Sequence, residues 1–513
     1  MRNKIKYILL PFSVLLLCTS CKKTIKNSKT IPPNIVIILA DDLGYGDPQI
    51  YNADSKIPTP NINRLAETGI RFTDAHTPSS VCTPTRYGLL TGQYAWRTEL
   101  KKSVLWMWDK PLIAKNKLTL PKLLKTKNYA TACIGKWHLG WRWPSNITNG
   151  YMNDTIAIGD WELKGRNDLW KHIDFSKPLG GGPLEAGFDY YFGDDVPNFA
   201  PYTFFENNTL TKIPNQLKPQ DMYGGTGPMA EGWKLENVMP EITKKAVNYI
   251  KKQSQTKQPF FLYFALTAPH TPIAPNSNFR GKTEIGPYGD FVHQVDWSVG
   301  QIVEALKASG QFNNTLLIFT SDNGSPQRDG TNMGGAIASV KKYGHDPSKP
   351  WKGMKADIWE GGHRVPFIAS WPEKITANST SNQVICLTDV MATVASFLDI
   401  PYDQEKAMED SYDISPLLLG TDKAIRSDIV HHSINGTFAI RKGDWKLILG
   451  KDSGGFSRSL KISGIPVTTN GQLYNLTNDP SESTNLYDQH PDTVNKLTAL
   501  LNHYKEKGYS NRN

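Results

Sequence analysis

The sequence predicts an α/β fold in which helices flank a large, mostly parallel sheet, and three observations support this prediction. Several short apolar runs are rich in β-branched or aromatic residues and lack the alternation of a half-exposed strand. Amphipathic helical stretches lie between these runs. The chain of 513 residues, with 39% hydrophobic and 21% charged residues, has a globular composition and enough length for one large domain and a smaller one.

Four apolar runs are predicted to be buried parallel strands, at residues 34–39, 260–264, 315–319 and 365–369. Helices are predicted between the strands, at residues 59–68, 118–127 and 290–309. The last helix carries a regular apolar face, formed by Val292, Val295, Val299, Ile302, Val303 and Leu306. Because strands alternate with helices, we expect a main α/β domain at residues 34–420.

Two regions depart from this alternation. Residues 141–235 are rich in Trp, Gly, Pro and Asn and have little periodicity, so we expect long insertions carried by the sheet. After residue 425, the pattern predicts a hairpin at 437–449, a strand at 472–476 and a helix at 491–507. These elements indicate a small α+β C-terminal domain at residues 425–513.

The first residues have the features of an export signal. A basic start is followed by an apolar run that is too short to span a bilayer, so residues 1–20 are predicted to be a signal peptide. The tripeptide that ends at Cys21 resembles the end of a bacterial lipobox, which would make Cys21 a lipidated residue and residues 21–33 a tether. A plain signal peptide cleaved nearby is the alternative. We expect a periplasmic or cell-surface protein that meets a membrane only through this anchor.

The charge distribution argues against a nucleic-acid partner, and the cysteines argue against a disulfide framework and a zinc site. The formal net charge is +10, but the first 30 residues hold seven of the 58 basic residues and none of the 48 acidic ones, which leaves +3 for the remainder. No basic patch or stripe suggests a nucleic-acid partner. Outside the leader the chain has Cys82, Cys133 and Cys386, whose number and spacing fit neither a disulfide framework nor a zinc site.

Oxygen-bearing side chains follow two of the predicted strands. Asp41 and Asp42 come after the strand at 34–39, and Asp322 and Asn323 come after the strand at 315–319. Ligands of open α/β sheets gather at the carboxyl ends of the strands. Either pair alone could cap the next helix, but four oxygen donors from two strands favour a hard cation, Ca²⁺ or Mg²⁺.

Histidines and lysines cluster near other strand ends. Lys136 and His138 follow a short strand, and His270 follows the strand that begins at residue 260. Lys352 and Lys355 lie shortly before the strand at residue 365. Taken singly, each histidine suits a structural role and each lysine a solvated one. Together, cations beside a metal at one edge of the sheet suit a multiply charged anion.

Residues 80–92, Ser-Val-Cys-Thr-Pro-Thr-Arg-Tyr-Gly-Leu-Leu-Thr-Gly, match the signature of the type I sulfatases, including its Cys-x-Pro-x-Arg core. Residues 129–138 resemble the second sulfatase signature, although Asn128 replaces the usual leading Gly. The chain thus resembles the formylglycine-dependent sulfatases, most of all the branch of arylsulfatase A and N-acetylgalactosamine-6-sulfatase. The resemblance implies a large mixed, mostly parallel sheet of the alkaline-phosphatase-like superfamily and a catalytic domain at residues 34–420.

The resemblance also implies a modified nucleophile and a calcium site. Cys82 would be converted to formylglycine by a maturation enzyme that reads Pro84 and Arg86, and Arg86 would hold the hydrated aldehyde. The implied ligands of Ca²⁺, or less readily of Mg²⁺, are Asp41, Asp42, Asp322, Asn323 and residue 82.

The remaining roles follow from the same resemblance. Lys136 and Lys355 would hold sulfate oxygens, and the spacing before Glu-Gly-Gly selects Lys355 over Lys352. His270 would protonate the leaving alkoxide, His138 would assist breakdown of the sulfated intermediate, and Asp322 would accept the proton of the nucleophile.

A sulfated carbohydrate is the expected substrate, with 6-O-sulfated galactose or N-acetylgalactosamine as the first candidate. Candidate sugar-stacking rings are Trp106, Trp108, Trp141, Trp143, Trp161 and Trp170. The alternative is that most of them pack in the core or cover loops. Candidate polar contacts in the insertions are His172, Asp174 and Asp194. Two alternatives remain: a phosphate or phosphonate monoester hydrolase of the same superfamily, and a glycan-binding lipoprotein with an inactive site. The second is disfavoured because every catalytic position is occupied.

Overall fold

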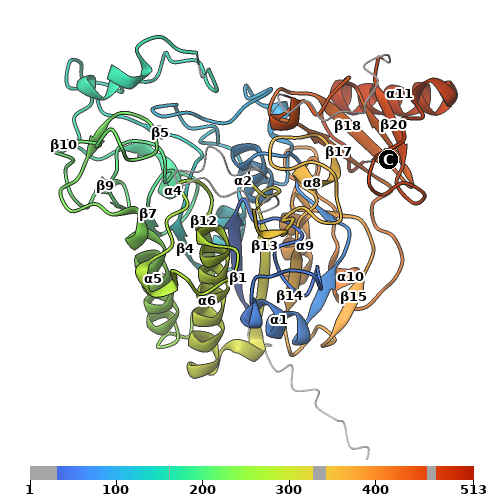
Figure 1. The fold of residues 1–513 in the computed structure, drawn as a ribbon. Helices are drawn as coiled ribbons and strands as arrows, with labels where there is room; N and C mark the ends of the chain where they lie inside the picture. Colours follow the sequence, from blue (N-terminus) through green and yellow to red (C-terminus); the bar gives the residue numbers. More distant parts are fainter. Residues whose placement is uncertain (1–31, 161, 327–341, 459–469, 513) are drawn as a thin grey trace, which may run out of the picture. The chain divides into compact units, whose positions relative to one another are not determined.

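A ten-stranded sheet forms the centre of the described part of the chain (Figure 1). The computed structural model describes residues 32–160, 162–326, 342–458 and 470–512. The predicted signal peptide and Cys21 lie outside these residues, as does Trp161. No helix in the described ranges combines the length and the apolarity needed to cross a membrane.

The sheet is mixed and mostly parallel, as predicted. In spatial order its strands are β15 (Ser379–Ser381), β2 (Ile70–Phe72), β14 (Phe367–Ser370), β13 (Thr315–Ser321), β1 (Asn34–Asp41), β12 (Phe260–Pro269), β4 (Ala130–Gly135), β7 (Tyr190–Gly193), β8 (Phe205–Glu206) and β9 (Thr209–Leu210). The five strands from β13 to β7 are parallel, and antiparallel pairs adjoin them on both sides. The carboxyl ends of these five strands therefore meet at one edge of the sheet.

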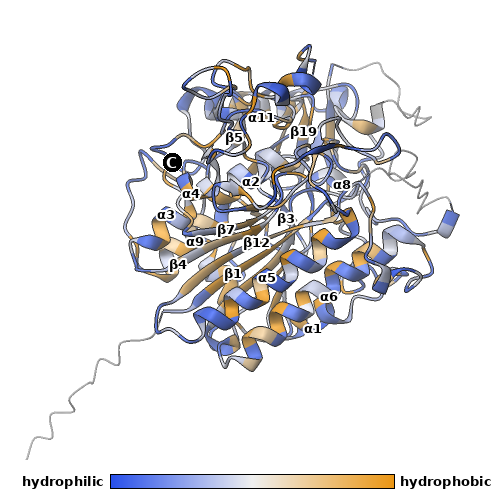
Figure 2. Ribbon diagram, turned by 90° about the vertical axis from the view of Figure 1, so that its left-hand side faces the viewer, coloured by the Kyte–Doolittle hydropathy of each residue, from blue (hydrophilic) through white to orange (hydrophobic). Residues whose placement is uncertain are grey.

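The central strands are apolar on both faces because helices cover both. In β1, Val36 and Ile38 belong to one hydrophobic cluster, while Ile35 and Ile37 belong to the other. Figure 2 shows the largely apolar strands with α1, α5 and α6 along one side. The helices of that face are α1 (Pro60–Glu67), α5 (Val238–Gln253) and α6 (Pro287–Ala308); those of the other are α2 (Cys82–Thr91), α3 (Leu120–Lys125) and α9 (Asp389–Phe397).

Helix α6 shows why the predicted apolar spacing held. Val292, Val295, Val299 and Leu306 have no exposed surface, and each such buried side chain stabilises the fold by about 1.5–3 kcal/mol. Val303 is only partly buried at the edge of the same cluster. The helix begins with Pro287, whose missing N–H costs nothing at that position.

The direction of β14 differs from the prediction. It was expected to be parallel, but it pairs antiparallel with β13, Ile318 lying opposite Ala369. The physical reason is the connection, because α8 (Glu360–His363) lies just before β14 and Gly324 N–H donates to the carbonyl of Gly362. The chain therefore re-enters the sheet from the edge at which β13 ends.

The insertions of residues 141–235 are packed on an aromatic cluster instead of forming open loops. Trp108, Trp141, Trp143 and Phe205 contact one another with ring centroids 5.0–6.2 Å apart. The short elements of this region are β5 (Trp141–Arg142), β6 (Gly180–Gly181), α4 (Gly182–Glu185), β10 (Gln216–Leu217) and β11 (Pro228–Met229). Buried Asn153 donates to the carbonyls of Trp108 and Trp141 at 2.7 Å, which satisfies two buried backbone acceptors.

A four-stranded antiparallel sheet forms the C-terminal part, as predicted. It consists of β17 (Asp428–His432), β18 (Phe438–Lys442), β19 (Trp445–Ile448) and β20 (Gln472–Asn475), and α11 (Pro491–Lys507) packs on it. The β18–β19 hairpin turns at Gly443, whose φ is +56°. One further two-stranded pair, β3 (Ala75–His76) with β16 (Ile385–Cys386), and the short helix α10 (Ser415–Leu418) complete the strands and α-helices described.

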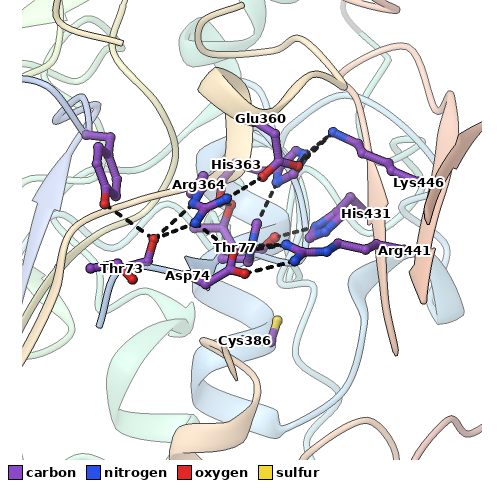
Figure 3. Close-up of polar contacts among 12 residues, drawn as sticks. Thr73, Asp74, Thr77, Glu360, His363, Arg364, Cys386, His431, Arg441 and Lys446 are labelled. Atoms are coloured by element: carbon purple, nitrogen blue, oxygen red, sulfur yellow. Dashed lines mark hydrogen bonds and ion pairs between the residues drawn. The ribbon is translucent and has the colours of Figure 1, made fainter. Parts of the chain in front are cut away.

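A group of buried ionised side chains, here called the buried charge cluster, joins this C-terminal sheet to the main sheet (Figure 3). Its members are Asp74, Glu360, Arg364, Arg441 and Lys446. Lys446 of β19 donates to Glu360 at 3.0 Å, and Arg441 of β18 donates to both carboxylate oxygens of Asp74 at 2.9 Å. Since breaking a buried ion pair costs about 3–5 kcal/mol, these contacts hold the segment around Glu360 against β19.

Candidate active site

Cys82 is the first residue of α2, at the carboxyl edge of the parallel strands. Val81 before it is extended, and the helix ends at Gly92, whose φ of +66° allows a left-handed cap. Every residue of this helix is buried, and Cys82 is a free cysteine with 2% of its surface exposed. Burial raises the pKa of its thiol even though Lys136 and Lys355 oppose the shift. An unmodified Cys82 is therefore a poor source of thiolate.

Arg86, one turn further along α2, links the ends of three strands. It donates from Nε and Nη2 to the same oxygen of Asp322, at 3.0 and 2.7 Å, and its Nη2 lies 3.4 Å from Asp41. Its Nη1 donates to the carbonyl of Lys136 at 3.2 Å. Although burial alone would lower it, the pKa of Arg86 is raised by Asp322, so this fully buried guanidinium is charged.

The oxygen-bearing side chains from β1 and β13 contact each other. The pairing of β1 with β12 shifts register between Leu39 and Asp41, and Asp42 has a φ of +66°, so the chain turns where β1 ends and Asp42 meets the residues that follow β13. The backbone N–H of Asp42 donates to Asp322 at 3.1 Å, and Nδ2 of Asn323 donates to Asp42 at 2.8 Å. All four side chains have no exposed surface.

These four residues fit a hard cation. Oδ1 of Asn323 is buried and accepts no hydrogen bond within the described structure, so an acceptor is left over among the carboxylates. Asp41, Asp42 and His270 also lie close enough together to share an ion. An all-oxygen set of three carboxylates and one amide is typical of Ca²⁺ or Mg²⁺ ligands.

Two lysines neutralise the acids. Nζ of Lys136 donates to both oxygens of Asp41, at 2.9 and 2.8 Å, and Nζ of Lys355 donates to Asp42 at 2.8 Å. Burial alone would raise the pKa of Asp41, but Lys136 and Arg86 hold it below its usual value. The pKa of Lys355 is likewise raised by Asp42 against the effect of burial. Lys355 is therefore an ammonium ion beside a carboxylate.

Backbone geometry places each lysine. Gly135 ends β4 with a φ of +108°, and a Cβ at that position would lie 1.8 Å from the carbonyl oxygen of Ala265. Only glycine therefore lets the chain pass β12 so closely and turn to present Lys136. Lys355 is held by its own N–H, which donates to the carbonyl of Ser325, and by Ala356 N–H, which donates to the carbonyl of Ser80. The second bond brings Lys355 beside the Cys82 segment.

In each of two histidines, one ring nitrogen donates a hydrogen bond to a backbone carbonyl and the other keeps its lone pair. Nε2 of His138 lies 2.9 Å from the carbonyl of Leu105, which can only accept, so Nε2 carries the hydrogen and Nδ1 has the lone pair. Nδ1 of His270 donates in the same way to the carbonyl of Thr271, which leaves Nε2 free, 3.7 Å from Asp42. Burial, with Lys136 for His138 and Lys355 for His270, holds both pKa values well below the ordinary one.

These groups surround a cavity of about 250 Å³. Cys82, His138, His270, Lys355 and Asp42 line its polar side. The opposite wall is largely apolar and comes from Trp106, Phe199, Tyr223, Ile434 and Phe456. The cavity thus combines a small polar end, where the Lys355 ammonium lies, with an aromatic wall, which suits a polar group attached to an organic body.

Comparison with known proteins decides the family. The family model described as Sulfatase matches residues 33–400, most of the chain. The chain belongs to the sulfatase family. It is 34% identical to an N-acetylgalactosamine-6-O-sulfatase of Bacteroides thetaiotaomicron, over 96% of this chain and 97% of that protein. It is 27% identical to the N-acetylgalactosamine-6-sulfatase of Canis lupus familiaris, over 93% of this chain and 86% of that protein.

A solved structure agrees with these relatives. A chain from work on the metabolism of multiple glycosaminoglycans by Bacteroides thetaiotaomicron superposes on the sulfatase with a TM-score of 0.77 and 32% identity. The match covers 93% of this sulfatase and 100% of that chain. Family and relatives together make the protein a sulfuric ester hydrolase.

In this sulfatase, the site residues that the sequence predicts lie together at one edge of the sheet. They are Asp41, Asp42, Cys82, Arg86, Lys136, His138, His270, Asp322, Asn323 and Lys355. Lys352 lies elsewhere: its Nζ donates to the carbonyl of Glu482 and stands 4.1 Å from the ring centroid of Trp359. The choice of Lys355 over Lys352 therefore agrees with the geometry.

Most of the candidate sugar-stacking rings pack in the core, which is the alternative that the sequence left open. Trp108, Trp141 and Trp143 are at most 1% exposed in the aromatic cluster, so no sugar can reach them. Trp170 packs partly buried against the same core, and only Trp106 lines the cavity. The sequence does not reveal the burial of these tryptophans, because the region has no periodicity that would distinguish core residues from surface residues.

None of the candidate polar contacts lines the cavity. Asp174 accepts hydrogen bonds from Ser176 on the surface, and His172 is exposed. Asp194 is buried, and neither of its carboxylate oxygens has a hydrogen-bond partner in the described structure. Burial and the neighbouring Asp195 raise the pKa of Asp194 to about 7.

Several residues of the site of this sulfatase carry no sequence signal. Thr83 donates to the carbonyl of His138 at 3.1 Å and accepts from Leu105 N–H, which joins the two segments that hold the His138 ring. Asp195 accepts from the backbone N–H of His138 at 3.1 Å. Tyr223 comes from the aperiodic insertion, where only its position in space marks it as part of the wall.

Proposed function

We propose that this sulfatase is exported and removes sulfate from a sulfated carbohydrate, with 6-O-sulfated N-acetylgalactosamine or galactose as the first candidate substrate. One observation carries the proposal: Cys82, Lys355 and His270 face a single small cavity above a buried set of acids. The 34% identity to an N-acetylgalactosamine-6-O-sulfatase over nearly the whole length of both chains supports the choice of sugar. The lipid anchor at Cys21 remains part of the proposal for export.

Cys82 is proposed to be converted to formylglycine before it acts. Two features support this: the thiol is a free, buried group with a raised pKa, and Pro84 and Arg86 complete the motif that a maturation enzyme would read. The hydrated aldehyde supplies a hydroxyl to attack sulfur and a second hydroxyl whose proton, when lost, allows sulfate to leave.

Ca²⁺ is the proposed cation, held by Asp41, Asp42, Asp322 and Asn323. Bound Ca²⁺ would supply positive charge beside the sulfate group and favour ionisation of a hydroxyl on residue 82. The ionised side chains of the site balance, because three carboxylates face Arg86, Lys136 and Lys355. A balanced site leaves the charge of a dication free to attract an anionic ester.

The lysines and histidines supply the remaining steps. Lys355 lines the cavity and Lys136 lies behind it on Asp41, so the two ammonium groups are proposed to hold sulfate oxygens. A proton on Nε2 of His270 would pass to the leaving alkoxide, and a negatively charged ester in the cavity raises the pKa that burial lowers. His138 would accept at Nδ1 the proton released at residue 82.

The test is desulfation of a panel of defined sulfated mono- and disaccharides, read by sugar and by sulfate position. We expect release of 6-O-sulfate from galactose or N-acetylgalactosamine by the wild-type protein and none by Cys82→Ala. An aryl phosphate serves as the comparison ester, and a higher kcat/KM for it than for the matching aryl sulfate would contradict the proposal. Release of sulfate only from another sugar would contradict the proposed substrate but not the proposed reaction.

A further inference from the structure

The catalytic cavity opens into a second hollow of about 680 Å³, here called the outer groove. The two spaces share four lining residues, Trp106, Asn198, Phe199 and Tyr223. The cavity of about 250 Å³ is smaller than the roughly 300–1,000 Å³ of most ligand pockets, so it suits one sulfated sugar. Anything attached to that sugar on the open side extends into the outer groove.

The loop that forms the outer groove is firmly held. Strands β10 and β11 close its base, and Gly225 N–H donates to the carbonyl of Asn198 at 2.8 Å. Tyr202 donates from its hydroxyl to the carbonyl of Gly225 at 2.8 Å. Gly224 has a φ of +129°, and a Cβ there would lie 2.4 Å from the Tyr202 hydroxyl, so the approach requires glycine. The groove is thus built by specific contacts.

Its lining is aromatic and positively charged. Tyr223 is 39% exposed, which leaves ring surface available to a sugar face. Lys218 bends back so that Nζ donates to the carbonyls of Pro219 and Met222, which fixes its ammonium group at the groove. None of the described residues that line the groove is acidic, so no carboxylate there offsets this charge.

We propose that the outer groove binds the sugar next to the sulfated one in an oligosaccharide, and that Lys218 selects a neighbour carrying a carboxylate or a second sulfate. The proposal rests on the proposed function, since it adds a subsite to the same reaction. Continuity with the cavity supports a sugar linked to the substrate, and the uncompensated lysine supports an anionic one. The protein then prefers an acidic oligosaccharide to the sulfated monosaccharide.

The experiment compares kcat/KM for three substrates: the sulfated monosaccharide, its disaccharide with a neutral neighbour, and its disaccharide with a uronic acid neighbour. We expect the wild-type protein to prefer the acidic disaccharide. Lys218→Gln should reduce that preference by about three- to fivefold, the range of a partly exposed ion pair. Lys218→Arg should keep the preference, and added salt should weaken it in the wild type more than in Lys218→Gln.

Lys212→Gln is the matched control, because it removes the same charge from an exposed residue of the same insertion that does not line the groove. Equal kcat/KM for all three substrates in the wild type would overturn the proposal. So would a loss in Lys218→Gln that is the same for every substrate. Desulfation of none of the three by the wild type would instead contradict the proposed function, which keeps the two failures apart.

Discussion

Asn323 donates from Nδ2 to Asp42 at 2.8 Å, while its own Oδ1, fully buried, accepts nothing in the described structure. An unsatisfied buried acceptor costs about 1–3 kcal/mol, which a cation ligand site would explain. We therefore predict that Ca²⁺ raises the melting temperature of the wild-type protein over that in a chelator. At a Ca²⁺ concentration 100 times Kd, binding raises the free energy of unfolding by about 2.7 kcal/mol.

Asn323→Leu tests the same relationship without reference to activity. Leucine has a similar size but no ligand atom, so the variant should lose most of the Ca²⁺-dependent shift in melting temperature. Asn382→Leu, at an exposed position, is the control and should keep it. An unchanged shift in Asn323→Leu would mean that Ca²⁺ stabilises the protein at another place.

Lys355→Met should lower kcat/KM for a sulfated sugar by roughly 10²–10³-fold, the usual cost of losing one preorganised charge at a reacting group. The matched control is Lys352→Met, which keeps a hydrocarbon chain over Trp359 and should stay within about threefold of wild type. Steady-state kinetics on one substrate measures both. Equal losses in the two variants would indicate a general effect of charge or folding.

Residue 82 should differ in mass from cysteine in the active protein. A peptide that spans it is expected to be about 18 Da lighter, because the CH₂SH group becomes an aldehyde. Protein produced in cells without a formylglycine-generating enzyme should retain the cysteine and show almost no activity. Full activity in a preparation whose residue 82 is entirely cysteine would contradict the proposed nucleophile.

Stability should fall in mild acid because of His432. Burial lowers the pKa of this histidine from its ordinary value of 6.5 to about 4, and its Nδ1 donates to the carbonyl of Ser433. Below pH 6.5 the unfolded chain takes up a proton there, whereas the folded protein does so only near pH 4. Protonation therefore favours unfolding, and His432 alone lowers the free energy of unfolding by about 3 kcal/mol between pH 7 and pH 4.

Urea unfolding at a series of pH values measures this effect. His432→Gln should show a shallower fall in the free energy of unfolding between pH 6.5 and pH 4 than the wild type. His503→Gln, at an exposed position, should follow the wild-type slope. Parallel curves for His432→Gln and the wild type would assign the acid sensitivity to other groups.

The sequence was most informative where strands end. Runs such as residues 315–319 are recognisable as buried strands, and the parallel arrangement brings whatever follows them to one edge. The sequence therefore predicts that Asp322 and Asn323 lie near Asp41 and Asp42, and both contact Asp42 in the structure. The direction of β14 was missed because nothing in residues 365–369 records the edge from which the chain returns.

The insertion was least predictable. Burial of Trp141 and Trp143 depends on contacts with Trp108 and Phe205, which are distant in sequence, and no period of 2 or 3.6 connects them. Tyr223 gave no signal for the same reason: its place at the cavity is decided by Gly224, Gly225 and their contacts with Asn198.

The buried charge cluster has a consequence for the order in which this enzyme becomes active. Lys446 pairs with Glu360, which lies only five residues after Lys355. The ribosome adds Lys446, however, long after the strands of the main sheet. Until it arrives, Glu360 lacks the ammonium group beside it in the finished fold, and the Lys355 segment lacks its support from β19. A growing chain that ends before residue 446 should therefore contain all ten predicted site residues and still be inactive.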